Sequence, residues 1–467
     1  MCTKKQQLVI LVLACSFNVF PSRTFAQIQS WVTHPASNLF LQKSTITTSP
    51  LKGNETLPCI FIDGLKTFQS MDGFGCTLTG GSAQVLAKMS AEKRAELLQE
   101  LFNPKAPGSI GISYLRISVG ASDLSDHAFS YNDLPDGQTD PQQLKFSLEP
   151  DRATFLPILK EILRINPAIK IMASPWSPPT WMKTNGNSKG GSLKPEYYAA
   201  YALYLVKYIK AMRSEGIVID ALTVQNEPLH PGNNPSLLMY AHEQANFVKN
   251  HLGPAFVKNG LKTKILIYDH NADRPDYPIA ILNDPLAKKY IDGSAFHLYG
   301  GTIDALSEVH AAHPDKNLYF TEQWIGAPGN MAGDLRWHIK NLMIGAPRNW
   351  AKNVLEWNLA SNPQWGPHTD GGCTECLGVV TLDADAITRN PAYYIIAHAS
   401  KFVQPGAKRI ASNTALSLAN VAFKNPDGST VLLIVNDGGD EVEFRVSAGK
   451  TGFVHKLADG AVATLVW

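Results

Sequence analysis

The chain has 467 residues, of which 44% are apolar and 18% charged, and this balance predicts a globular protein with a sizeable core. The formal net charge is only +2, and no basic cluster is interleaved with aromatic residues, so composition gives no electrostatic case for nucleic acid or an anionic membrane surface as a partner. The sequence also has no Walker-type phosphate loop and no His-Glu-x-x-His zinc motif.

Residues 1–26 have the pattern of a secretory signal peptide. Two lysines precede an apolar run at residues 8–20, which is too short to span a membrane comfortably, and residues 24–26 offer a small-residue cleavage site. We expect cleavage before Gln27 and export to the periplasm or the extracellular space. A looser lipoprotein-like pattern that would leave a lipid anchor on Cys15 is the alternative. No later segment is long and apolar enough to cross a bilayer.

Residues 27–71 are polar and rich in β-forming residues, with strand candidates at 44–48 and 59–63. So few strands cannot bury a core alone, and we expect them to join a sheet formed elsewhere in the chain.

Four cysteines lie beyond the leader: Cys59, Cys76, Cys373 and Cys376. In an oxidising compartment such residues can form disulfides, but their pairing stays open. Cys373 and Cys376 would supply two metal ligands where a structural zinc site needs four, and no matching second pair exists, so we expect no metal here. A local disulfide or two structural thiols are the remaining interpretations.

Between residues 72 and 403, short apolar runs alternate with amphipathic stretches, as in repeated βα units. Helical stretches are expected at residues 83–102, 152–165, 195–214 and 237–252. Eight runs are candidate strands, at residues 72–77, 114–119, 169–174, 221–225, 264–268, 293–298, 318–321 and 353–358. Eight such units predict an α/β fold, a (β/α)8 TIM barrel. An open doubly wound sheet is the alternative, but it more often has a glycine-rich phosphate turn after its first strand, and Gly73-Phe74-Gly75 is only a weak echo of one.

Residues 404–467 lose the helical period. Alternating strands are predicted at 416–423, 430–436 and 441–446, separated by the turn sequences at 425–428 and 436–438. This pattern predicts a small antiparallel β-sandwich fused to the barrel and completed by the N-terminal strands.

Two glutamates follow apolar strands of the predicted barrel. Glu227 comes after the fourth strand and before Pro228, which cannot continue a strand, and Glu322 ends the seventh. Each fits a loop-capping role equally well when taken alone. Strand ends in such a barrel share one face, and strands four and seven lie across its mouth from each other, so the two carboxylates can meet there. Two facing carboxylates are what cleavage of a glycosidic bond requires, and this placement favours retention of configuration.

The neighbouring residues indicate which role each of the two carboxylates has. Arg116 and Tyr299 are candidates for keeping Glu322 ionised, by charge and by hydrogen bond. Glu227 then lies beside an ionised carboxylate, which raises its pKa and suits it to be the general acid. Arg116 also fits an ion pair inside the barrel without any role in catalysis.

Further residues at the strand ends are candidates for substrate binding. Asn226 is placed to hold the sugar 2-hydroxyl, and Trp357 to form the floor of the subsite. For His297, a structural hydrogen-bonding role fits as well as a ligand contact. The predicted substrate-binding set is Asp123, Trp176, Asn226, His297, Tyr299 and Trp357.

At these positions the sequence resembles glycoside hydrolase family 30, from about residue 72 to the C-terminus. The motifs that carry the resemblance are the run from Ala173 to Gly186, together with Phe74-Gly75, Arg116, Asp123, Asn226-Glu227-Pro228, His297-x-Tyr299, Glu322 and Trp357-Asn358-Leu359-Ala360. The resemblance implies a barrel joined to a β-sandwich that both chain ends build. It also implies Glu227 as acid/base and Glu322 as nucleophile, with no metal or organic cofactor.

Two loops depart from the glucosylceramidase pattern within that family. Residues 371–378 and 269–271 look more like the members that include endo-β-1,6-glucanases. These loops shape the subsites, so they leave the leaving-group side of the substrate open.

We therefore expect an exported retaining hydrolase of β-glucosidic bonds, of the glucosylceramidase type, with a glycolipid or β-glucan substrate. An endo-β-1,6-glucanase acting on polysaccharide is the alternative. A xylan- or galactan-directed hydrolase ranks third. A non-catalytic carbohydrate-binding barrel ranks last, because both carboxylates are present.

Overall fold

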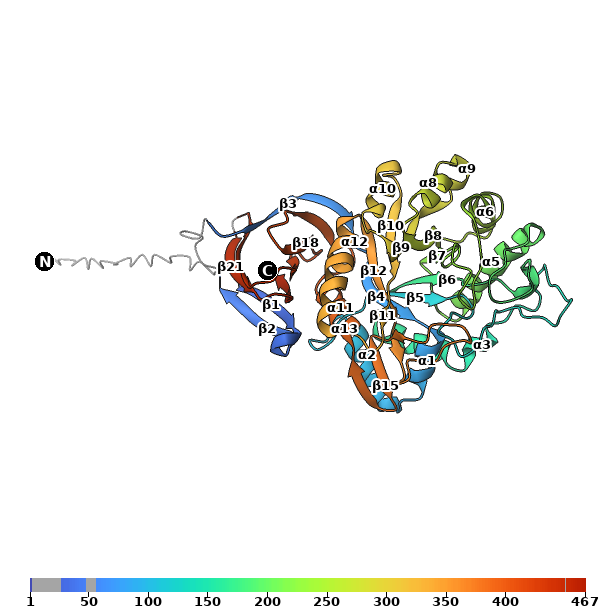
Figure 1. Cartoon of the computed structure of the whole chain (residues 1–467), viewed down its shortest axis with the longest axis horizontal. Coiled ribbons are helices and arrows are strands. Elements are labelled where there is room, and N and C mark those ends of the chain that lie inside the picture. Colours follow the sequence, from blue (N-terminus) through green and yellow to red (C-terminus); the bar gives the residue numbers. More distant parts are fainter. Residues whose placement is uncertain (2–26, 48–55, 450) are drawn as a thin grey trace.

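The computed structural model describes residues 1, 27–47, 56–449 and 451–467, and the predicted leader, with Cys15, lies outside the described residues apart from Met1. Figure 1 shows a helix-covered barrel beside a smaller β-domain. Within the described ranges, no helix combines the length and the apolar character needed to cross a membrane.

Eight parallel strands close into a barrel, in the order β10-β12-β4-β5-β6-β7-β8-β9. Each overlaps one of the eight strands that the sequence predicts, so the predicted TIM barrel is confirmed. The barrel strands are β4 (Gly73–Leu78), β5 (Tyr114–Ser118), β6 (Lys170–Ser174), β7 (Ala221–Thr223), β8 (Lys264–Ala272), β9 (Ile291–Gly301), β10 (Asn317–Glu322) and β12 (Ala351–Asn358).

Helices connect the strands and cover the outside of the barrel (Figure 1). The longer ones are α1 (Gly80–Ala87), α2 (Ala91–Phe102), α4 (Phe155–Ile165), α5 (Tyr198–Ser214), α6 (Ala241–Phe247), α8 (Asp276–Leu282), α10 (Ala305–Ala312), α11 (Met331–His338) and α13 (Pro391–Ser400). Shorter helical segments are η1 (Pro35–Ser37), α3 (Glu149–Arg152), η2 (Thr180–Met182), η3 (Pro195–Tyr197), η4 (Val248–Leu252), α7 (Gly253–Lys258), α9 (Pro285–Lys288), η5 (Ile339–Ile344) and α12 (Gly345–Arg348).

Two helix predictions need correction, and local capping explains both. The stretch 83–102 is two helices, because the Ser90 side chain accepts a hydrogen bond from the Lys93 N–H and starts α2 afresh. The stretch from residue 237 becomes helical only at Ala241. There the Glu243 carboxylate accepts a hydrogen bond from the Tyr240 N–H at 2.7 Å, which fixes the start of α6.

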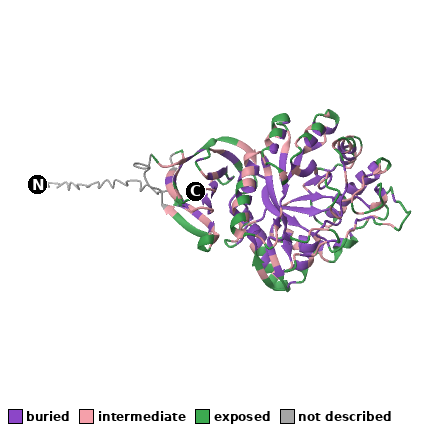
Figure 2. Cartoon of the chain, viewed as in Figure 1, coloured by how far each residue is buried: buried purple, intermediate pink, exposed green. Residues whose placement is uncertain are grey.

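A layer of apolar side chains fills the barrel interior, which is buried throughout in Figure 2. Seven strands contribute one side chain each, and on β5 and β7 that residue is the first of the strand. This layer fills the barrel interior below the carboxyl ends of the strands, which is the face where active sites of this fold lie. The layer consists of Tyr114, Met172, Ala221, Leu266, Ala295, Tyr319 and Leu355.

The second domain is one nine-stranded sheet, in the order β2-β1-β22-β19-β18-β17-β3-β20-β21. Its two edge strands contact each other, so the sheet folds over on itself to form the β-sandwich. Both chain ends contribute, and β3 pairs with β20 in parallel while the other pairs are antiparallel. The strands are β1 (Gln27–His34), β2 (Leu39–Thr47), β3 (Cys59–Ser70), β17 (Lys408–Ser412), β18 (Leu418–Lys424), β19 (Thr430–Asn436), β20 (Val442–Ala448), β21 (Thr451–Leu457) and β22 (Val462–Val466).

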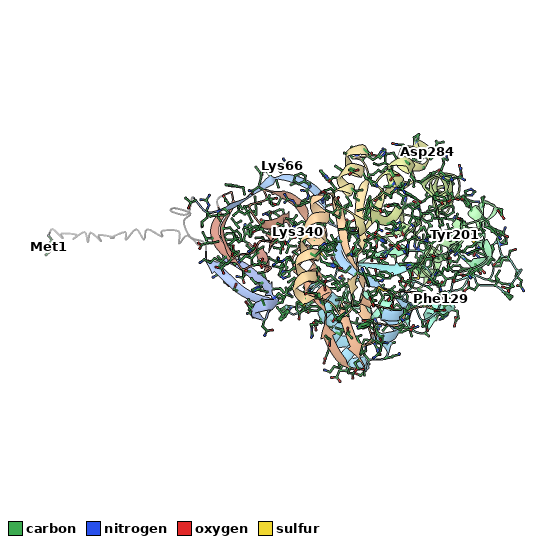
Figure 3. The ribbon with its side chains drawn as sticks, viewed as in Figure 1. Met1, Lys66, Phe129, Tyr201, Asp284 and Lys340 are labelled. Atoms are coloured by element: carbon green, nitrogen blue, oxygen red, sulfur yellow. A yellow bond between two sulfur atoms is a disulfide. The ribbon has the colours of Figure 1, made fainter. Side chains whose placement is uncertain are left out.

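The sandwich is fixed to the side of the barrel by an apolar face and a few polar contacts. β19 is buried on both faces: Leu432 and Ile434 point into the sandwich core, while Leu433 belongs to the barrel cluster. Lys340, labelled in Figure 3, forms an ion pair with Asp437 of the sandwich. Exposed ion pairs contribute only about 0–1 kcal/mol, so the apolar face holds most of this contact.

Candidate active site

The two predicted catalytic glutamates lie on one cavity at the carboxyl ends of the barrel strands. The cavity has a volume of about 270 Å³. One carboxylate oxygen of Glu227, one of Glu322 and a ring nitrogen of His297 all lie within 4.8 Å of one another. The residues that line the cavity are Asp123, Glu227, His230, Asn233, His270, Asn271, Tyr299, Glu322, Trp324, Trp357, Cys373 and Cys376.

Arg116, on β5, is fully buried beneath the cavity and reaches Glu322. The other terminal nitrogen of its guanidinium donates to Asp269 at 2.8 Å and to Asn226 at 2.7 Å. The guanidinium also lies over the Trp176 ring, 4.8 Å from its centroid. Arg116 is therefore both a barrel-interior ion pair and a partner of Glu322, so the two alternatives left open by the sequence hold together.

Asp269, to which the sequence assigned no role, is the anion at the centre of this network. It accepts hydrogen bonds from the hydroxyls of Thr321 at 2.6 Å, Thr223 at 2.7 Å and Ser174 at 3.0 Å. Burial acts to raise the pKa of Asp269, but the charge of Arg116, the hydrogen bond and charge of His297 and the hydrogen bond from Thr321 together outweigh it and hold that pKa far below its usual value. The sequence signal that could have identified Asp269 is its position, because it is a carboxylate at the end of β8 just as the two glutamates are carboxylates at other strand ends.

His297, on β9, connects the two carboxylate groups that flank it. Its Nδ1 lies 3.1 Å from Oε1 of Glu227, and its Nε2 lies 3.2 Å from Oδ1 of Asp269. Burial acts to lower the pKa of the ring, but the charges of Glu322 and Asp269 outweigh it and raise the pKa to about 9. The ring therefore carries two protons at neutral pH and donates in both directions.

The charge on His297 reverses the order expected for the pKa values of the two glutamates. Burial acts to raise both pKa values. For Glu227, the hydrogen bond and charge of His297 outweigh burial and hold the pKa below its usual value. For Glu322, burial outweighs the charges of His297 and Arg116, and the pKa is raised. The sequence predicted a raised pKa for Glu227, because Arg116 and Tyr299 were expected to keep the neighbouring Glu322 ionised. That prediction included no cation beside Glu227. The proton that Glu227 can use therefore rests on His297.

Tyr299, also on β9, completes the surroundings of Glu322. Its hydroxyl donates to Oε1 of Glu322 at 2.9 Å. Arg116 contacts the other carboxylate oxygen, so both oxygens of Glu322 have a hydrogen-bond donor and the carboxylate is held in one orientation.

The backbone at the ends of β7 and β8 adopts an unusual conformation. Glu227, Tyr268 and Asp269 have φ angles of 45°, 73° and 64°, in the left-handed region that side chains other than glycine avoid. Each costs on the order of 1–2 kcal/mol. The Glu227 N–H donates to the Asp269 carbonyl at 2.9 Å, so one hydrogen bond links the two strained strand ends and helps to fix Glu227.

The predicted substrate-binding residues divide into two groups. Asp123, Tyr299 and Trp357 line the cavity. Trp176, Asn226 and His297 are buried behind its wall and do not line it, so the structure does not place them as surface contacts. Trp176 stacks on Trp357 with 5.4 Å between ring centroids and so supports the ring that lines the cavity.

Asp123 is a third carboxyl group on this cavity. Burial, followed by the charge of Glu322, raises its pKa to about 7, against a hydrogen bond from Asn233 that acts to lower it. Asp123 is therefore partly protonated near neutral pH and can both donate to and accept from a hydroxyl group.

The loops add residues that the sequence did not assign to the site. Cys373 and Cys376 form a disulfide bond that lines the cavity, so the local-disulfide interpretation is confirmed. Cys376 lies on β14 (Cys376–Leu377), which pairs with β11 (Ile325–Gly326) just after Glu322. Trp324 also lines the cavity. The remaining short strands, β13 (Ala360–Ser361), β15 (Val380–Asp383) and β16 (Ala386–Arg389), form a small sheet in the same β12–α13 connection.

The donors of Glu227, His297 and Glu322 are close enough together to hold a metal ion. A metal would need the neutral form of His297, whereas the pKa of this ring is about 9. Arg116 and Tyr299 already occupy the oxygens of Glu322. This donor set is suited to hydrogen bonding and proton transfer more than to metal binding.

Two family models together match most of the chain, from residue 71 to residue 465. The glycosyl hydrolase family 30 TIM-barrel domain matches residues 71–403, and the glycosyl hydrolase family 30 β-sandwich domain matches residues 406–465.

Individual relatives fall into two named groups. The endo-1,6-β-D-glucanase neg1 of Aspergillus fumigatus is 35% identical over 406 residues, covering 81% of each chain. The lysosomal acid glucosylceramidase of Mus musculus is 30% identical over 434 residues, covering 86% of this chain and 82% of that relative. Among solved structures, an endo-β1,6-glucanase superposes with a TM-score of 0.86 at 36% identity, covering 94% of this chain and 99% of that one.

The charge network predicts how His297 responds to the loss of its neighbour. Replacing Asp269 with Asn removes one of the anions that hold the His297 proton, so we expect the pKa of His297 to fall from about 9 towards its usual 6.5. Histidine-selective ring NMR across pH, with the His297 signal assigned from a His297→Gln spectrum, measures this shift. Asp292→Asn, at the other end of the barrel, is the matched control and should leave the His297 pKa unchanged. An equal His297 pKa in wild type and Asp269→Asn would contradict the network.

Proposed function

The chain belongs to glycosyl hydrolase family 30 and is a glycoside hydrolase, and from that premise we propose that it is a retaining endo-β-1,6-glucanase. The observation that supports the chemistry is the pair Glu227 and Glu322, with carboxylate oxygens within 4.8 Å of each other across one cavity. Retaining enzymes place their carboxyl groups about 5–5.5 Å apart, whereas inverting enzymes leave about 6.5–9.5 Å for a water molecule. The short separation therefore favours direct attack by one carboxylate.

In the first step, Glu322 attacks the anomeric carbon, the bond to the leaving oxygen breaks, and Glu227 gives its proton to that oxygen. Arg116 and Tyr299 hold Glu322 by both oxygens, which fixes its direction of attack. His297 can supply the proton that Glu227 needs across their 3.1 Å contact.

In the second step, Glu227 takes a proton from a water molecule, which attacks the anomeric carbon and displaces Glu322. The product keeps the configuration of the substrate. The proton that Glu227 has taken from the water passes back to His297 across the same 3.1 Å contact, so both glutamates and His297 return to their starting states.

Similarity to relatives favours polysaccharide over glycolipid as the substrate. The sequence analysis put a glucosylceramidase-type activity first, and this stays a family-level likeness. The endo-1,6-β-D-glucanases from three fungi, at 32–36% identity, support the alternative better. The loops at 269–271 and 371–378, which depart from the glucosylceramidase pattern, point the same way.

We further propose that the chain is exported and cleaved before Gln27. The strand β1 begins at Gln27 and pairs along its length with β2 and β22, so cleavage at this point leaves the sandwich whole. Mass spectrometry of the exported protein is expected to give Gln27 as its N-terminus. A chain that starts at a lipid-modified Cys15 would replace this proposal with the anchored alternative.

Product analysis tests the proposed substrate and mode of action. We expect β-1,6-glucan to release oligosaccharides at the earliest times, because an endo-acting enzyme cleaves within the chain. Mass-resolved chromatography over a time course on β-1,6-glucan and on glucosylceramide makes the comparison. Glucose as the sole early product, or turnover of glucosylceramide alone, would overturn the endo-glucanase assignment in favour of the glycolipid alternative.

Chemical rescue tests the two roles separately. Glu322→Gln removes the nucleophile, and we expect turnover to fall about 10³-fold or more. Glu227→Ala should lose activity on glucan but keep attack on an aryl glucoside whose leaving group needs no proton. Added azide should then restore turnover and give the β-glycosyl azide, identified by NMR. An α-glycosyl azide would contradict retention, and rescue in Glu322→Ala instead would exchange the two roles.

A further inference from the structure

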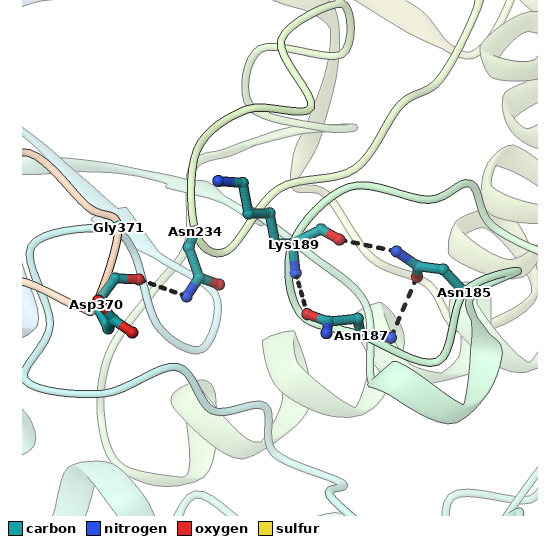
Figure 4. A pocket seen from close by; sticks show the side chains of 6 residues that line it. All are labelled: Asn185, Asn187, Lys189, Asn234, Asp370 and Gly371. Atoms are coloured by element: carbon teal, nitrogen blue, oxygen red, sulfur yellow. Dashed lines mark hydrogen bonds between the residues drawn. The ribbon is translucent and has the colours of Figure 1, made fainter.

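A second cavity, of about 550 Å³, is shown in Figure 4. It is formed by the loops that follow β6, β7 and β12. Neighbouring residues of the same loops line the two cavities: Asn233 faces the catalytic cavity and Asn234 the second, while Cys373 faces the first and Gly371 the second. The second cavity is lined by Asn185, Asn187, Lys189, Asn234, Asp370 and Gly371.

Hydrogen bonds between the loops hold this second cavity in shape. The Asn234 side chain donates to the Asp370 carbonyl at 2.8 Å and accepts from Ser188 at 2.8 Å, so one amide links all three loops. Within the β6 loop, Asn185 donates to the Lys189 carbonyl at 2.8 Å (Figure 4). A binding surface that is formed in advance loses less conformational entropy when a ligand arrives.

A buried lysine supports these loops from below. Lys183 has no exposed surface, and its ammonium donates to the carbonyls of Ser188 and Ser236, both at 2.7 Å. It therefore ties the β6 loop to the β7 loop underneath the second cavity. Burial lowers the pKa of Lys183 to about 7, which is a cost that the three-loop arrangement has to offset.

Three groups on the rim are free to bind a ligand. Within the described part of the chain, the Asn187 amide nitrogen, the Lys189 ammonium and the Asp370 carboxylate make no hydrogen bond, and the bonds of these residues run through their other atoms. They offer two donors and one acceptor, and the opposite charges of Lys189 and Asp370 cancel. None of the lining residues is aromatic. A neutral ligand rich in hydroxyl groups matches this surface, whereas an anion or an apolar group does not.

We propose that this cavity is a distal subsite that binds a glucosyl unit of the same β-1,6-glucan chain that is cleaved between Glu227 and Glu322. The proposal rests on the proposed endo-glucanase function and adds to it a second point of attachment for the polymer. An endo-acting enzyme needs such a point, because each additional bound unit positions the chain across the catalytic cavity.

Removing the rim groups tests the subsite. The double variant Lys189→Ala, Asp370→Ala changes two exposed side chains, so the fold should be unaffected. We expect kcat/KM on β-1,6-glucan to fall about 5- to 30-fold, mainly through KM, and kcat/KM on an aryl β-glucoside to stay at the wild-type value. Lys105→Ala, an exposed lysine beyond α2 at the opposite end of the barrel, is the matched control and should behave as wild type on both substrates.

Binding in an inactive background gives a second readout. Calorimetry of a β-1,6-linked glucohexaose with Glu322→Gln, with and without the rim substitutions, should show a Kd that the substitutions raise by a similar factor. If wild type cleaves β-1,6-glucan and the rim variant matches it in both experiments, the subsite proposal is wrong and the function stands. If wild type does not cleave β-1,6-glucan, the proposed function fails and the subsite proposal fails with it.

Discussion

The buried pair of Arg116 and Asp269 is the interaction on which the rest of the site depends. Both side chains are completely buried, and a buried charge costs several kcal/mol unless a partner and hydrogen bonds compensate it. Here the compensation comes from six strands: Arg116 lies on β5 and Asp269 on β8, and Asp269 also receives bonds from β6, β7, β9 and β10. One anion therefore fixes how most of the barrel strands meet at the level of the active site, and the catalytic residues are attached to the strands so fixed.

The same network sets the charge of the cavity. Two cations, Arg116 and His297, face three carboxylates, Asp269, Glu227 and Glu322, which leaves one negative charge in excess when all five groups are ionised. Cleavage of a glycosidic bond passes through a transition state with positive charge at the anomeric carbon. An excess negative charge that the protein holds in place before the substrate binds stabilises that transition state without reorganisation. His297 contributes twice, since its charge tempers the repulsion between the carboxylates and its proton lies next to Glu227.

The barrel and the positions of both glutamates could be predicted from the sequence, because they depend on local patterns. Apolar runs predict strands, and Glu227 and Glu322 are the residues where two such runs end. The charge distribution could not be predicted in the same way. The pKa order of the two glutamates depends on His297, and the charge of His297 depends on Asp269, a residue on another strand. Trp176 illustrates the same limit: its place after β6 is correct, but its burial behind Trp357 depends on how two strands pack.

The division between barrel and loops explains why chemistry is easier to derive than substrate. The two proposed catalytic glutamates lie at or just beyond the ends of strands whose direction and register the barrel fixes, so a motif of a few residues is enough to place them. The proposed distal subsite lies on the loops after β6, β7 and β12, which have little regular structure and are held by Lys183, by Asn234 and by the Cys373–Cys376 disulfide. None of these three constraints produces a periodic pattern in the sequence, because each acts through a side-chain contact that connects one loop to another or closes a loop on itself. A sequence can therefore keep the cleavage chemistry of its family while the loops change which polymer or lipid reaches it.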